Sequence, residues 1–131
     1  MKNRPFRERL SFAVAGLRTG WRRERSLRTH GLFALLALAT LVVLRPAPLW
    51  WAVVAVVIAL VVALELVNAA IEGVIDLLHP GLHPEIKAIK DMVAGAVLAI
   101  SLAALAVALA LIIDSARVHD WLAATGWLRR E

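Results

Sequence analysis

Residues 49–78 read LWWAVVAVVIALVVALELVNAAIEGVIDLL, a stretch without proline and with Gly73 as its one glycine. As a helix it would be about 45 Å long at ~1.5 Å per residue, whereas the hydrocarbon core of a bilayer is about 30 Å thick. Residues 49–64 are entirely apolar, and the acidic residues come only after them. We therefore expect a membrane-spanning helix whose second half projects into the cytoplasm.

The composition supports a membrane protein of one domain, residues 1–131. The chain is 61% hydrophobic and its mean hydropathy is +0.76, more apolar surface than a soluble domain of this size can bury. It has no cysteine, which excludes disulfides and cysteine-ligated zinc. The fold class that we expect is an all-α membrane protein.

The remaining segments follow from apolar runs and helix breakers. We expect an amphipathic surface helix within residues 1–28, weakened at Gly16 and Gly20, and a first span over 26–44. A proline turn at 45–48 precedes the second span, 49–78, and an inner loop at 79–84 precedes a third span, 85–113. Residues 114–131 form a mixed tail, for which an interfacial helix is one interpretation.

Topology follows from the basic residues. Nine of the fifteen Lys and Arg residues lie within residues 1–30, whereas the first loop carries only Arg45. Cytoplasmic flanks are enriched in Lys and Arg, so we expect the N-terminus inside and the C-terminus outside. The net charge of +5 is then explained by the basic residues that flank the first span on its cytoplasmic side. We therefore expect no nucleic-acid partner.

One polar stripe runs along the second span, formed by Glu65, Asn68, Glu72 and Asp76. At ~100° per residue these positions fall within an arc of about 80°. A charged side chain inside a membrane helix costs at least ~2.5 kcal/mol, so the stripe requires cations or protons near it. Glu65 is placed just inside the hydrocarbon and Asp76 in water. A site that joins a lipid alcohol to a soluble phosphate donor needs this layout.

Each of these residues also has a structural interpretation. Glu72 and Asp76 suit a solvated face, Asn68 suits helix–helix bonding, and Lys90 suits snorkelling to lipid phosphates. Glu24 falls on the apolar face of the surface helix, where an i,i+4 pair with Arg28 is the simplest account. The histidines match no tight zinc motif and are expected at the interface: His30, His79 and His83.

Two motifs resemble those of the prokaryotic diacylglycerol kinase family. The first is Glu65-Leu-Val-Asn68-Ala-Ala-Ile-Glu72-Gly-Val-Ile-Asp76, and the second is Lys90-Asp91-Met-Val-Ala-Gly-Ala-Val-Leu98. The family pattern reads E-x-x-N-x-x-I-E-x-x-x-D and then K-D-x-x-x-x-A-V. Upstream, Gly16-Leu17-Arg18 and Trp21-x-x-Glu24 match as well. The resemblance covers about residues 10–113 and contains none of the soluble kinase motifs.

The resemblance implies a homotrimer whose active sites form between subunits at the cytoplasmic face. Mg-ATP would phosphorylate a lipid hydroxyl, with Glu65 as general base. Glu24 and Glu72 would be metal ligands, and the ATP- or substrate-binding residues would be Asn68, Asp76, Lys90 and Asp91. The membrane would be the bacterial inner membrane.

The acceptor lipid is less closely defined. The stretch Glu24-Arg-Ser-Leu-Arg28-Thr-His30 ends in histidine, where Gram-negative diacylglycerol kinases carry an acid. This form, with His83-Pro84 in the loop, is similar to the Gram-positive branch, some of which phosphorylates undecaprenol. We expect diacylglycerol as acceptor, with undecaprenol as the alternative.

Two functions from other classes fit the sequence less well. An ion-translocating subunit using Glu65 would need polar residues through the full membrane depth, and the outer halves of the spans carry almost none. A structural protein that binds anionic lipid through its basic helix would leave the stripe of acids unexplained.

Overall fold

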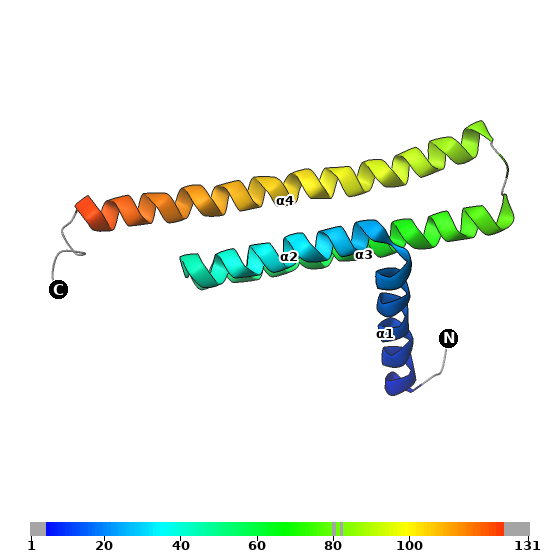
Figure 1. Ribbon diagram of the computed structural model, residues 1–131, viewed down its shortest axis with the longest axis horizontal. Helices are drawn as coiled ribbons and strands as arrows, with labels where there is room; N and C mark the ends of the chain where they lie inside the picture. The colour runs from blue at the N-terminus through cyan, green and yellow to red at the C-terminus, as the bar shows by residue number, and fades with distance from the viewer. Residues whose placement is uncertain (1–4, 80, 82, 125–131) are drawn as a thin grey trace.

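Four helices make up the described part of the chain. The computed structural model describes residues 5–79, 81 and 83–124. Its helices are α1 (Phe6–Arg23), α2 (Arg25–Leu44), α3 (Pro48–Leu78) and α4 (Pro84–Ala124). The last three run alongside one another, and α1 branches off across their direction (Figure 1). The expected all-helical fold, with three spans after an N-terminal helix, is confirmed.

Three helices are long and apolar enough to cross a membrane: Arg25–Leu44, Pro48–Leu78 and Pro84–Arg117. The buried core between them is small and centres on Leu41, Val54 and Leu111. Most large apolar side chains on these helices are exposed in the single chain. Such a surface requires lipid or further protein to cover it, as expected for an integral membrane protein.

The turn between α2 and α3 is set by its prolines. Arg45 adopts a left-handed conformation (φ 47°, ψ 50°), and its N–H donates to the Leu41 carbonyl over 2.9 Å. The following Pro46 disfavours a right-handed helical conformation at Arg45, so α2 ends there. Pro48 occupies the first turn of α3, where its missing N–H costs nothing.

The third long helix continues further than the sequence predicted. We expected it to end at residue 113, with a separate tail from 114, but α4 runs without a break to Ala124. No proline or glycine follows until Gly126, and polar residues alone do not end a helix. The Trp50 Nε1–H donates to Asp114 Oδ2 over 2.9 Å and ties α4 to the start of α3. The part of the predicted tail at 125–131 lies outside the described residues, as do residues 1–4 of the surface segment.

The surface helix also ends earlier than predicted. The chain leaves the helical conformation at Glu24 (φ −95°, ψ 118°), between α1 and α2, and not at Gly16 or Gly20. Arg28 Nη1 donates to the carbonyls of Trp21 (3.0 Å) and Arg22 (3.2 Å), at the end of α1. The expected pair between Glu24 and Arg28 is therefore wrong, because Arg28 caps α1 instead.

Two close approaches hold α1 against the spans. A Cβ on Gly31 would lie 2.6 Å from ring atoms of Trp21, and a Cβ on Gly20 would lie 2.5 Å from Leu66 Cδ2. Both distances are shorter than real side-chain contacts allow, so only glycine fits beneath the tryptophan without a shift of the ring. The end of α1 thus packs on α2 and α3, and Glu24 is placed at this junction.

Candidate functional site

The stripe of polar residues on α3 becomes more exposed along the helix. Glu65 is only 3% exposed, Asn68 and Glu72 are half-buried, and Asp76 is exposed. The same helix therefore carries a buried carboxylate and, about three turns later, an exposed one. Exposure therefore increases from Glu65 to Asp76, and the membrane depth of the two ends of the stripe stays a prediction.

Both carboxylate oxygens of Glu65 have partners on α2. The Ser26 hydroxyl donates to Oε2 over 2.7 Å, and His30 Nε2 lies 3.0 Å from Oε1. Ser26 and His30 are four residues apart, so they lie one turn apart on the same face of α2. The first turns of α2 thus form a polar cradle for a side chain of α3.

Sequence reasoning missed this cradle. His30 was assigned to the interface, and Ser26 was not singled out. The available signal was the i,i+4 spacing of two hydrogen-bonding side chains at the start of a span. Such spacing defines a shared face but not the residue that the face contacts.

The cradle explains how a carboxylate is tolerated in this position. Burying an isolated charge costs much free energy. Charge-assisted hydrogen bonds are short and strong, so they offset part of that cost. Ser26 donates such a bond to Oε2 of Glu65, and the His30 imidazole contacts Oε1. Glu65 is therefore held in one orientation by two side chains, rather than free to rotate.

Two further residues of the predicted site are Asn68 and Glu24, whose side chains are at least half-buried. The side-chain oxygen Oδ1 of Asn68 is buried and accepts no hydrogen bond within the described residues. Buried polar oxygens are normally bonded, so this atom is available to a ligand or to another chain. Glu24 is half-buried at the junction of α1 and α2.

The predicted magnesium ligands do not form a closed protein cage. Among the described residues, no three of His, Cys, Asp and Glu lie close enough together to hold a metal ion. Mg²⁺ is usually bound by one or two carboxylates together with water and substrate phosphates. The carboxylates of Glu24 and Glu72 are donors of the right chemistry for an ion that arrives with a nucleotide.

Ion pairs join the water-exposed ends of α3 and α4. Lys90 Nζ lies 2.7 Å from Asp76 Oδ1 across the two helices, and Lys87 pairs with Asp91 within α4. The structure thus brings together two of the predicted nucleotide-binding residues, Lys90 and Asp76. Exposed pairs of this kind contribute about 0–1 kcal/mol to stability, so the pairing leaves Lys90 available to a stronger anion.

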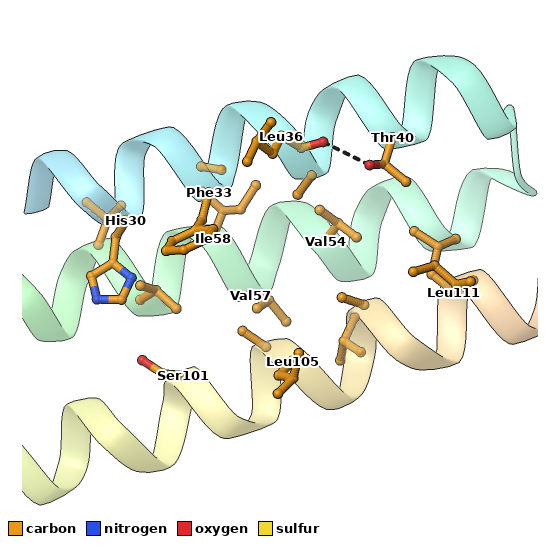
Figure 2. A pocket seen from close by; sticks show the side chains of 18 residues that line it. His30, Phe33, Leu36, Thr40, Val54, Val57, Ile58, Ser101, Leu105 and Leu111 are labelled. Carbon is orange, nitrogen blue, oxygen red and sulfur yellow. Dashed lines mark hydrogen bonds between the residues drawn. The ribbon is translucent and has the colours of Figure 1, made fainter.

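An apolar pocket of about 450 Å³ lies between α2, α3 and α4 (Figure 2). Its three polar lining residues are His30, Thr40 and Ser101. The hydroxyls of Thr40 and Ser101 donate to carbonyls of their own helices, those of Leu36 and Val97. His30 alone among these three binds a residue of another helix, and it lies at the end of the pocket away from Leu111 (Figure 2).

Comparison with family models identifies the family. The model named prokaryotic diacylglycerol kinase matches residues 11–112. The chain therefore belongs to the prokaryotic diacylglycerol kinase family, and it is a membrane lipid kinase of that family. A comparison with curated proteins gives no match.

Replacement of Ser26 by alanine tests the cradle. We expect Ser26→Ala to lower the free energy of unfolding in detergent by about 1–3 kcal/mol, because a buried carboxylate oxygen loses its donor. Ser101→Ala is the matched control, since its hydroxyl donates to its own helix. Equal losses of stability in the two variants would contradict a specific contact to Glu65.

Proposed function

We propose that this chain is an ATP- and Mg²⁺-dependent lipid kinase that converts diacylglycerol to phosphatidic acid in the bacterial inner membrane. Undecaprenol is the alternative acceptor within the same family. The observation that carries the proposal is the buried carboxylate of Glu65, which lies beside the polar end of an apolar pocket and begins a stripe that emerges into water. The family match supports the reaction class.

The pocket suits the acceptor. Its lining is apolar apart from three polar side chains, and His30 at one end contacts Glu65. A hydrocarbon chain in this pocket would leave its hydroxyl at the end where Glu65 and His30 meet. Both candidate acceptors carry one free hydroxyl at the end of an apolar lipid, so either could present its hydroxyl there.

The exposed part of the stripe suits the donor. Lys90 carries a compact positive charge that can contact ATP phosphates, with Asp76, Asp91 and Asn68 as neighbouring polar groups. Glu24 and Glu72 would hold Mg²⁺ together with those phosphates. When bound, the ion neutralises charge on the transferring phosphoryl group.

The reaction joins the two ends of the site. The lipid hydroxyl oxygen bonds to the γ-phosphorus, the bond from that phosphorus to the β–γ bridging oxygen breaks, and ADP leaves. The hydroxyl must lose its proton, and Glu65 is the general base that takes it. The cradle on α2 holds Glu65 in place, so positioning contributes as well as basicity.

The same arrangement supports the proposed orientation and assembly. The basic surface helix and the polar ends of α3 and α4 would lie on the cytoplasmic side, where ATP is found. A homotrimer, as the family resemblance implies, would cover part of the exposed apolar surface. A neighbouring subunit could also supply a donor to Asn68 Oδ1.

Phosphate transfer with both lipids tests the proposal directly. Purified protein in mixed micelles should transfer label from radiolabelled ATP to diacylglycerol in the presence of Mg²⁺, and Glu65→Gln should lower kcat by about 10²–10⁴-fold. Undecaprenol is measured side by side. Label on undecaprenol alone would establish the alternative acceptor, and no label on either lipid would contradict the kinase. A Glu65→Gln rate above about a third of wild type would remove Glu65 from the chemistry.

The two lysines of α4 separate nucleotide contact from interfacial anchoring. Lys90→Ala should lower kcat/KM for ATP strongly and leave KM for the lipid nearly unchanged, because its ammonium lies at the aqueous end of the stripe. Lys87→Ala is the matched control, since Lys87 pairs with Asp91 within its own helix. Mild and equal effects at the two positions would make Lys90 a generic interfacial lysine.

A further inference from the structure

Arg28, in the first turn of α2, is bonded to the end of the helix that precedes it. Its Nη1 donates to the carbonyl of Trp21 over 3.0 Å and to that of Arg22 over 3.2 Å. These carbonyls belong to the last turn of α1, where backbone carbonyls have no partner within the helix. A guanidinium there supplies charge-assisted bonds and interacts favourably with the helix dipole. Arg28 therefore joins α1 to α2 across the one non-helical residue between them, Glu24.

Trp21 is held at two points in this junction. Its carbonyl accepts from Arg28, and its ring lies so close to Gly31 that a Cβ there would be 2.6 Å from ring atoms. Arg28 and Gly31 both belong to α2 and lie about one turn apart. The residue before the tryptophan, Gly20, is buried and lies close to Leu66 on α3. The last turn of α1 is thus fixed against both α2 and α3.

Glu24 depends on these contacts for its position. Its N–H donates to the Gly20 carbonyl over 2.8 Å, so its backbone is part of the same junction. The Arg28 guanidinium is bonded to backbone carbonyls, which leaves the Glu24 carboxylate to a cation from outside the chain. Mg²⁺ demands nearly octahedral geometry. An ion that Glu24 and Glu72 hold together therefore requires a fixed junction between α1 and α2.

We propose that Arg28 is a positioning residue for the proposed Mg²⁺ ligand Glu24, because its cap on α1 holds the junction from which Glu24 reaches the ion. This inference rests on the proposed lipid kinase function. It assigns Arg28 to the placement of a ligand and not to contact with ATP or lipid. Loss of the guanidinium leaves the α1 carbonyls to water and frees the last turn of α1 to move. Residues that orient a metal ligand typically contribute about 10–100-fold to metal affinity or activity.

Direct contact with ATP phosphates is the competing role for Arg28, since arginine is well suited to bind phosphate. The two roles differ in how they depend on Glu24. A capping residue acts through Glu24, so its removal changes little once Glu24 is gone. A phosphate ligand acts independently of Glu24, so the two losses would multiply.

The Mg²⁺ response of kinase activity separates these roles. Arg28→Ala should raise the Mg²⁺ concentration for half-maximal activity by about 10–100-fold and leave KM for the lipid nearly unchanged. Arg28→Lys keeps a cation that can donate to the carbonyls and should restore part of the response. In protein that already carries Glu24→Ala, Arg28→Ala should add little. Arg25→Ala removes an exposed arginine from the same turn of α2. It is the matched control and should behave as wild type.

Distances between spin labels report on the junction without turnover. The chain has no cysteine, so nitroxides can be attached at introduced cysteines alone. Arg9 on α1 and His79 at the end of α3 are exposed positions for them, with labelled chains diluted in unlabelled ones. The distance distribution should broaden or shift in Arg28→Ala and stay unchanged in Arg25→Ala. Arg28→Met, which keeps an apolar stem, replaces Arg28→Ala if that variant does not assemble.

Three results would overturn the proposal. The first is an unchanged Mg²⁺ response in Arg28→Ala, and the second is a loss that is equally large when Glu24 is already alanine. The third is an unchanged distance distribution between α1 and α3. A wild-type protein that transfers phosphate to neither lipid would instead contradict the proposed function, and the distances would still show whether Arg28 fixes the junction.

Discussion

A carboxylate buried within a membrane-spanning helix is the constraint on which the rest of this structure depends. Glu65 is 3% exposed, and an uncompensated charge at that depth would oppose insertion. The chain meets this constraint with polar side chains at the start of α2, where Ser26 and His30 bind opposite oxygens of the carboxylate. For these two residues to reach Glu65, α2 must begin level with the middle of α3, and the chain must leave α1 at Glu24.

The break at Glu24 is part of the same arrangement. Arg28 donates to carbonyls of Trp21 and Arg22 and so caps α1, and the Trp21 ring lies against Gly31. These contacts direct α1 away from the bundle and leave Glu24 at the junction (Figure 1). The proposed metal ligand Glu24 thus lies at the α1–α2 junction, two residues before Ser26, which donates to the proposed base Glu65 on α3.

The spans and the polar stripe could be predicted because each depends on a local rule. Apolar length identifies a membrane helix, and the 3.6-residue period places Glu65, Asn68, Glu72 and Asp76 on one face. The partners of Glu65 could not be predicted, since spacing on α2 shows that Ser26 and His30 share a face but not what that face contacts. The end of α1 was misplaced because tertiary contacts of Trp21 and Arg28 decide it. The end of α4 was misplaced because polar residues were treated as a stop, although polar residues alone do not end a helix.

The contact between His30 and Glu65 is tested most directly by nitrogen NMR of the histidine side chains. In protein labelled with ¹⁵N at histidine and placed in bilayers, His30 is assigned as the histidine whose resonances vanish in His30→Gln. Because His30 Nε2 lies 3.0 Å from Glu65 Oε1, the expected result is that Glu65→Gln shifts the Nε2 resonance of His30, while those of His79 and His83 stay unchanged. If no His30 resonance responds to Glu65→Gln, then the two side chains do not form the pair on which the site depends.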